Sequence, residues 1–143
     1  MNNETSQLLS DTAEKLFSDH VTKNCIEEAE KGIWPETLWN EVINNGLNLI
    51  LVPEDLGGVG GTWMNAGILF KASGRYQAPI PLAENIVASY VLSLGNISIP
   101  ENALLTILEG SFDSQKGLIS GTSARTPFSS NSTHGVVLFN DNK

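Results

Sequence analysis

A glycine-rich stretch, LVPEDLGGVGGTW at residues 51–63, is the segment of this sequence whose composition most resembles that of a functional site. It places four glycines in five positions after a proline and two acids. Backbone of this freedom can cradle a phosphate, link two domains, or form a tight turn between two helices. The surrounding residues have to decide among these three possibilities.

The specific phosphate-binding motifs do not match this loop. A Walker loop requires Lys and then Ser or Thr after its last glycine, whereas Gly61 is followed by Thr62 and Trp63. The dinucleotide fingerprint, started at Gly58, has its second glycine at Gly60 but Trp63 where the third belongs. The sequence excludes both motifs and leaves the linker and the turn open.

The other reactive residue types form no recognisable catalytic or metal-binding set. His20 and His134 lie in segments of different character, and neither has a second ligand nearby at a usual spacing. Cys25 is the single cysteine, so no intrachain disulfide or thiolate cluster is expected. Adjacent Glu54 and Asp55 point in different directions in regular structure, which makes them a poor acid–base pair. These residues alone indicate a helical domain without a catalytic motif.

Apolar residues recur with helical spacing along most of the chain, and glycine or proline separates the segments. Leu47–Val52 is expected to be a buried extended connector, because Pro53 follows at once. The predicted helices run from about Leu8 to Gly32, from Pro35 to Asn45-Gly46, from Trp63 to Tyr76, from Leu82 to Gly95-Asn96, and from Pro100 to Gly110.

The composition changes after residue 110. From Ser111 onward the chain is rich in Ser, Thr, Asn and Gly, with strand-like runs at Gly117–Gly121 and Val136–Phe139. Isolated strands bury little surface, so this stretch is too short for a domain of its own. We expect a mainly α fold, with a helical domain over residues 1–110 and a short β-rich tail over 111–143.

Charge and hydropathy narrow the class of partner. The formal net charge is −8 at pH 7 with only eight basic residues, which argues against unaided nucleic-acid binding. No apolar stretch approaches the roughly 20 residues that cross a bilayer, so no membrane span is expected. The N-terminus, MNNETSQLLSD, has neither the positive nor the apolar region of a secretory signal. The sequence therefore favours a cytoplasmic protein.

Taken in order, these features resemble the N-terminal helical domain of acyl-CoA dehydrogenases. The resemblance rests on two stretches, LWNEVINNGLNLILVPEDLGGVGGTW at 38–63 and KASGRYQAPIPLAENIVASYVLSLGN at 71–96. In the family a Trp-bearing helix leads to Gly-Leu and then to a Val-Pro-Glu-acidic-x-Gly-Gly-x-Gly loop. Here these are Trp39, Gly46-Leu47 and Val52–Gly60. The resemblance covers roughly residues 30–110.

The resemblance implies that the glycines shape a tight turn, with Glu54 and Asp55 favourably placed for the dipole of the following helix. It also implies a complete fold of three parts: a helical domain, a middle β-domain and a C-terminal helical bundle. FAD lies between the last two, a glutamate of the bundle removes the α-proton of the acyl-CoA substrate, and a β-hydride passes to the flavin.

In such an enzyme the N-terminal domain mainly walls the acyl-chain pocket. The residues that the resemblance assigns to this wall are Pro81, Leu82, Asn85, Ile86 and Ser89. A purely structural role in the core is an equally good interpretation of Leu82 and Ile86.

Two departures from the family pattern bear on activity. The flavin-contacting Thr-Glu-Pro and Gly-Ser-Asp string is absent after the last predicted helix, where the sequence reads SFDSQK and then GLISGTSARTPFSS. That stretch resembles a later part of the middle domain. The sequence also ends at Lys143, without the C-terminal bundle and its glutamate. Such chains resemble less typical members, including partner subunits of heteromeric sterol- or lipid-degrading dehydrogenases.

Three hypotheses follow. The first is the N-terminal part of an FAD-dependent acyl-CoA dehydrogenase, inactive alone and assembled as a homo- or hetero-oligomer. The second is a non-catalytic helical module that pairs with a full-length dehydrogenase. The third is an unrelated helical domain whose loop matches by chance; substitutions at Gly57 and Gly58 would then have little effect on stability.

Overall fold

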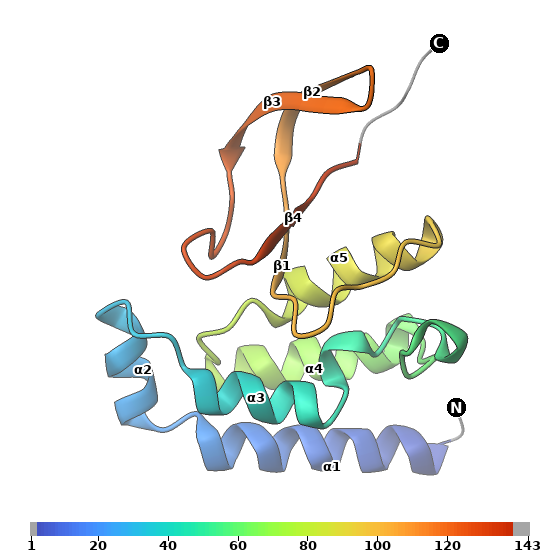
Figure 1. Cartoon of the computed structure of the whole chain (residues 1–143). Coiled ribbons are helices and arrows are strands. Elements are labelled where there is room, and N and C mark those ends of the chain that lie inside the picture. Colours follow the sequence, from blue (N-terminus) through green and yellow to red (C-terminus); the bar gives the residue numbers. More distant parts are fainter. Residues whose placement is uncertain (1–2, 139–143) are drawn as a thin grey trace.

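The computed structural model describes residues 3–138 and shows a layered helical body from which a β-hairpin projects (Figure 1). Two short 3₁₀ helices, η1 (Leu47–Leu49) and η2 (Glu54–Leu56), lie in the long connection between α3 and α4. The α-helices of the described residues are α1 (Asn3–His20), α2 (Lys23–Glu30), α3 (Glu36–Asn44), α4 (Trp63–Tyr76) and α5 (Leu82–Leu94). A mainly α fold is therefore confirmed.

One apolar core holds the helical body together. α1 packs chiefly on α4 and also contacts α3, while α5 packs on η1. The core members come from every α-helix except α2, which buries no residue. Those with no exposed surface include Phe17, Val42, Leu69 and Ile86.

The first predicted helix is wrong at its C-terminal end. The chain leaves the helix at His20 and begins α2 at Lys23, so what the spacing predicted as one helix to Gly32 is two. Thr22 causes the restart, because its extended backbone and its hydroxyl, which accepts a hydrogen bond from Cys25 N at 3.2 Å, form an N-cap.

The next three predicted helices are confirmed. α3 begins after Pro35 and ends at Asn44, and Gly46 then adopts φ +66°. α4 and α5 cover the predicted 63–76 and 82–94. Proline before a helix and glycine or asparagine after it are strong boundary signals, which explains the agreement.

The segment after α3 is buried as predicted but is not extended. Its apolar side chains Leu47, Ile50, Leu51 and Val52 are all at most 5% exposed. The backbone, however, turns through η1 and a further turn, with Val52 N donating to Leu49 O at 3.0 Å. This compact path lets the amides of residues 59–61 donate hydrogen bonds to the carbonyls of residues 49–52.

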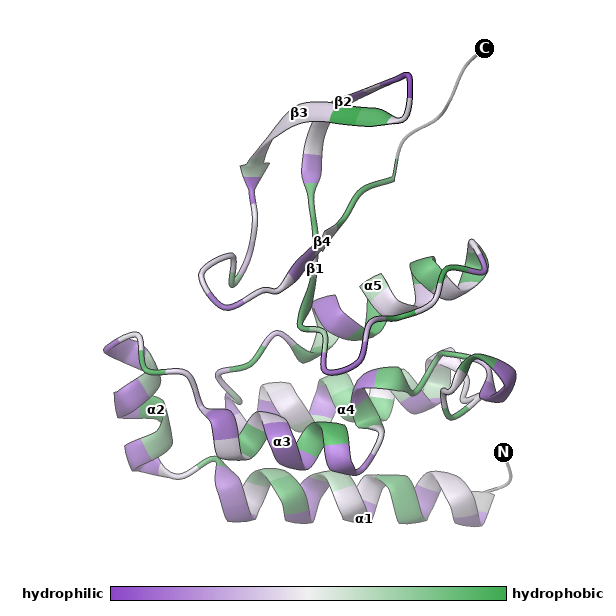
Figure 2. Cartoon of the chain, in the orientation of Figure 1, coloured by the Kyte–Doolittle hydropathy of each residue, from purple (hydrophilic) through white to green (hydrophobic). Residues whose placement is uncertain are grey.

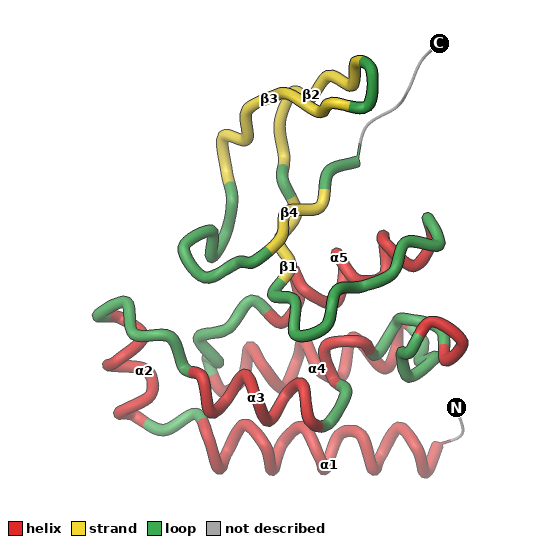
Figure 3. Tube along the Cα trace, in the orientation of Figure 1, coloured by secondary structure: helices red, strands yellow, loops and turns green. Residues whose placement is uncertain are grey.

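The predicted helix from Pro100 to Gly110 is wrong, because this stretch forms strands (Figure 3). β1 (Leu105–Ile107) pairs in parallel with β4 (His134–Val136), and β2 (Glu109–Gln115) pairs antiparallel with β3 (Leu118–Arg125). A leucine-rich run is ambiguous between a helix and a buried strand. Here the pairing with β4 and the hydrogen bond that Leu105 N donates to Asn85 Oδ1 of α5 select the strand.

The connection between β2 and β3 is a tight two-residue turn. Lys116 (φ +52°) and Gly117 (φ +77°) both have positive φ, as a two-residue hairpin of the primed type requires. The strand-like run predicted at Gly117–Gly121 falls at this turn and in β3. The run predicted at Val136–Phe139 meets β4 at Val136, and Phe139 lies outside the described residues. The division of the chain near residue 110 stays a prediction.

Candidate functional site

The glycine loop is a closed turn, and none of its amides from Leu56 to Gly61 is free for a phosphate. Each backbone N–H from Leu56 to Gly61 donates to a backbone carbonyl of residues 49–54. Gly60 N bonds Val52 O and Gly61 N bonds Ile50 O, both at 2.8 Å. Phosphate-binding loops work by pointing free N–H groups at the anion. Of the three possibilities, the tight turn is confirmed.

Two different physical demands explain the glycines. Gly57 (φ +84°) and Gly60 (φ +67°) adopt left-handed conformations that favour glycine. At Gly58 and Gly61 the obstacle is space: a Cβ at Gly58 would collide with the Val52 carbonyl, and one at Gly61 would lie 2.7 Å from Ile50 O. A side chain at Gly58 or Gly61 would therefore force the backbone to shift, and one at Gly57 or Gly60 would hold a strained left-handed conformation.

The acids of the loop do not serve the dipole of α4, so that expectation is wrong. Glu54 and Asp55 lie in η2, whereas α4 begins at Trp63. The N-terminus of α4 is instead satisfied by a capping box. Asn65 N donates to Thr62 Oγ1 at 3.4 Å, and Thr62 N donates to Asn65 Oδ1 at 2.9 Å.

The residues assigned to the acyl-chain wall lie together at the N-terminal half of α5. Pro81 precedes the helix and is buried, and Leu82, Asn85, Ile86 and Ser89 are each at most 1% exposed. Leu82 and Ile86 belong to the helical core. None of the five lines the cavities described below. Their role as a substrate wall stays a prediction.

Asn85 joins α5 to the β part of the molecule. Its Oδ1 accepts a hydrogen bond from Leu105 N at 2.8 Å, and its Nδ2 donates to Ser89 Oγ at 3.5 Å. The side chain has no exposed surface, so loss of this bond would leave a buried amide of β1 without a partner. The resemblance assigned Asn85 to the acyl-chain wall, and the sequence contained no signal for this backbone contact.

A cavity of about 290 Å³ lies beside the junction of α1 and α2, and its lining includes His20, Cys25 and Glu28. Burial, and then the charge of Glu28, raise the pKa of the Cys25 thiol. A raised pKa keeps the thiol protonated, and the protonated form is a poor nucleophile. Within residues 3–138, no group of three His, Cys, Asp or Glu side chains is placed to hold a metal ion.

A second cavity of about 360 Å³ lies between the helical body and the turn before β4. Trp34, Pro35, Pro79 and Phe128 are among its lining residues. Phe128 has φ +53°, which is uncommon for a bulky aromatic residue, and its carbonyl accepts hydrogen bonds from Asn131 N and Ser132 N, both at 3.0 Å. The long-range contact between segments 26–35 and 128–131 had no signal in the sequence.

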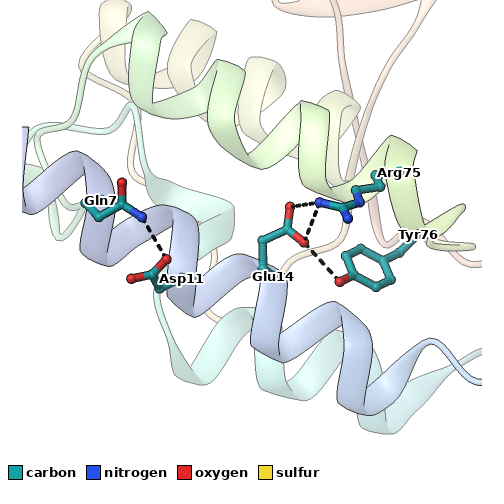
Figure 4. A network of polar contacts seen from close by, with 5 residues as sticks. All are labelled: Gln7, Asp11, Glu14, Arg75 and Tyr76. Atoms are coloured by element: carbon teal, nitrogen blue, oxygen red, sulfur yellow. Dashed lines mark hydrogen bonds and ion pairs between the residues drawn. The ribbon is translucent and has the colours of Figure 1, made fainter.

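A polar network joins α1 to α4 (Figure 4). Glu14 accepts hydrogen bonds from Arg75 Nη1 at 3.1 Å and from Tyr76 Oη at 2.9 Å, and Gln7 Nε2 donates to Asp11 along α1. The hydrogen bond to Glu14 is the largest cause of the raised pKa of Tyr76. Because Arg75 is largely exposed, its ion pair contributes at most about 1 kcal/mol.

Three places in the described residues do not fit the pyrophosphate of FAD, the cofactor that the resemblance implies: the glycine loop, the N-terminus of α4 and a hollow on the hairpin. Such a group needs free backbone N–H groups or cationic side chains. The glycine-loop amides are already bonded, and the N-terminus of α4 is capped. A hollow of about 290 Å³ on the hairpin is lined by Asp113, whose carboxylate would repel a phosphate, together with Ser111, Phe112, Ser120 and Gly121.

No helix within residues 3–138 has the length and apolar character needed to cross a membrane. The cytoplasmic location stays a prediction.

Comparison with known proteins assigns the helical body to a family. Residues 3–111 match the family model described as "Acyl-CoA dehydrogenase, N-terminal domain". The chain is 30% identical to acyl-CoA dehydrogenase IpdE2 of Mycobacterium tuberculosis, with 76% of this chain and 35% of the relative covered. It is 28% identical to IpdE2 of Mycolicibacterium smegmatis, with 62% and 30% covered. The chain thus spans about a third of the length of these relatives.

The fold comparison agrees. A solved structure described as the Tcur3481-Tcur3483 steroid ACAD G363A variant superimposes with a TM-score of 0.74 at 26% identity. The match covers 94% of this chain and 44% of the other, so it includes β strands as well as the helical body.

Proposed function

Since this chain belongs to the acyl-CoA dehydrogenase family, we propose that it is the N-terminal part of an FAD-dependent enzyme that introduces an α,β double bond into acyl-CoA thioesters. The observation that carries the proposal is the match of residues 3–111 to the N-terminal domain of that family, supported by the similar fold. In this proposal the chain supplies one wall of the acyl-chain pocket. The flavin site and the proton-abstracting glutamate come from other residues of the assembly.

The wall that we propose is α5. This helix is held on two sides, by the helical core through Leu82 and Ile86 and by β1 through Asn85. A wall fixed in this way keeps a constant distance from the substrate, which favours selection of one acyl shape over another. The likeness to a structure described as a steroid ACAD supports bulky, ring-bearing acyl groups as the first substrates to test.

The first experiment asks whether the chain is sufficient for the reaction. The purified 143-residue chain is supplied with FAD, an acyl-CoA and an artificial electron acceptor. We expect no turnover, because neither the glycine loop nor the hairpin hollow fits the pyrophosphate of FAD. Robust oxidation by this chain alone would contradict the proposal. The same assay on the tagged protein isolated with its natural partners should show activity.

The second experiment tests the wall itself, in that active assembly. Leu82 and Leu69 are both fully buried leucines, but only Leu82 lies on α5. Leu82→Ala should change the ratio of kcat/KM between a ring-bearing and a straight-chain acyl-CoA. Leu69→Ala should lower the amount of folded enzyme and leave that ratio unchanged. Equal ratios in both variants would remove α5 from the pocket.

A second candidate function is a non-catalytic subunit that pairs with a full-length dehydrogenase. The β2–β3 hairpin favours it, because Leu118 is 75% exposed and Ile119 is 55% exposed. Figure 2 shows this apolar start of β3 standing out on the projecting hairpin. Isolation of the protein with a distinct dehydrogenase subunit, whose activity is unaffected by Leu82→Ala, would favour this role. A monomer at all concentrations would count against it.

A further inference from the structure

A cavity of about 420 Å³ lies among three connecting segments, and no residue of α5 lines it. Its walls come from the end of α3 and η1, from the start of the glycine loop, and from the connector between α5 and β1. In Figure 1 this connector returns from the end of α5 toward the helical body before it enters β1. A volume of this size suits a small organic molecule.

One residue that lines this cavity, Asn48, has a side-chain oxygen without a hydrogen-bond partner among the described residues. Its side chain is only 8% exposed, and that oxygen, Oδ1, is buried. A buried acceptor without a donor destabilises the folded state, and native proteins carry few of them. Leucine has a similar shape and would avoid this cost, so the fold alone does not explain an asparagine here.

To present its oxygen to the cavity, the amide of Asn48 has to turn about its terminal torsion, which places Nδ2 where Oδ1 was. The terminal torsion of asparagine has broad minima, so the amide plane turns more easily than an aliphatic side chain changes rotamer. Because Oδ1 accepts no hydrogen bond, such a turn breaks no bond to that oxygen. A donor inside the cavity would supply the partner that the protein does not.

The rest of the lining limits the chemistry of the ligand. Ile43, Leu49, Leu56 and Ile99 make much of the wall apolar. Glu101 is the only charged residue of the lining, and the chain as a whole carries a net charge of −8. Both features disfavour anions, including the phosphates of a CoA thioester.

We propose that this cavity binds a small apolar molecule, neutral or cationic, whose O–H or N–H group donates a hydrogen bond to Asn48 Oδ1. The site is separate from the proposed acyl-chain wall, and its test does not depend on dehydrogenase activity.

The test compares three six-carbon probes that share an apolar tail. The full chain is titrated with 1-hexanol, hexylammonium or hexanoate while NMR follows its amide signals, including the side chain of Asn48. We expect saturable shifts at the lining residues with the alcohol and the ammonium, and at least tenfold weaker binding of hexanoate, which has no donor at neutral pH. Equal binding of all three probes, or no saturable binding, would overturn the proposal.

Two variants separate a binding role from a structural one. Asn48→Leu should leave the thermal midpoint equal to or above that of the natural chain, and should weaken binding of the alcohol and the ammonium about tenfold. Asn48→Asp keeps an acceptor and should restore binding of the ammonium. Asn40→Leu, at an exposed position of α3, is the matched control and should leave binding unchanged. If Asn48→Leu unfolds the chain, or leaves binding intact, the proposal fails.

Discussion

The helical body and the β2–β3 hairpin are built on opposite principles. The body has a continuous apolar core to which α1, α3, α4 and α5 all contribute. The hairpin has an antiparallel ladder, with a register shift between Glu109 and Gly110, but no buried residue along either strand. Two-stranded hairpins are marginal in water. The comparison teaches that stability resides in the helices, whereas the hairpin offers apolar surface that other residues of an assembly could cover.

The largest effect should come from removing a core side chain of the helical body. Phe17→Ala takes away a fully buried ring and should cost about 3–5 kcal/mol of the free energy of unfolding. Leu118→Ala, on the hairpin, should change it by less than about 0.5 kcal/mol. Urea titration of both variants measures this difference. Similar losses would show that the hairpin is as well packed as the helices.

The glycine loop should be the next most sensitive feature. Gly58→Ala would drive a Cβ into the Val52 carbonyl and should destabilise the chain by about 1–3 kcal/mol. Gly67→Ala, inside α4, meets no atom within 4 Å and should stabilise it by about 0.5–1 kcal/mol. Thermal unfolding of this pair checks the prediction. Neutral behaviour at Gly58 would show that the backbone around Val52 shifts to admit a Cβ without cost.

The contact between α5 and β1, the strand that precedes the hairpin, should show an intermediate effect. Asn85→Ala leaves Leu105 N buried without an acceptor, at a cost of about 1–3 kcal/mol. Hydrogen exchange should then accelerate in β1 and β4 more than in α1 or α4. Asn40→Ala, exposed on α3, serves as the control. Uniform acceleration throughout the chain would show that Asn85 does not act at this junction.

The smallest effect concerns pH. The hydrogen bond to Glu14 raises the pKa of Tyr76 above its ordinary value of 10.0, so the folded state favours the protonated phenol. Its contribution is therefore complete below about pH 10 and is lost as the pH rises through the higher pKa of the folded state. The urea midpoint should fall more between pH 8 and pH 11 for the natural chain than for Tyr76→Phe. Equal falls of the urea midpoint in the natural chain and in Tyr76→Phe would contradict a link between the protonation of Tyr76 and stability.

Local signals made most of the helical body predictable, and long-range contacts account for what was missed. Pro35, Asn45-Gly46 and Gly95 sit at helix ends because their backbone preferences act within one turn. The stretch at 100–110 was mispredicted because its leucines fit a helix or a strand. The deciding hydrogen bond comes from Asn85, 20 residues earlier, and the partner strand β4 lies about 29 residues later.

The candidate sites likewise divide into one that consecutive residues predicted and one that depends on long-range packing. The order of glycines at 57–61 predicted a shaped turn, because the family motif is contained in consecutive residues. The unpartnered oxygen of Asn48 had no signature in the sequence, since burial without a partner is a property of three segments packed together. The acyl-chain wall on α5 rests on resemblance and stays a prediction.

The most direct test of the central proposal is the native mass and flavin content of the protein isolated from its own cells under non-denaturing conditions. We predict a mass well above 15.4 kDa, with flavin absorbance that is bleached on addition of an acyl-CoA. A 15.4 kDa monomer without flavin or acyl-CoA response would contradict the proposal that this chain works as part of an acyl-CoA dehydrogenase.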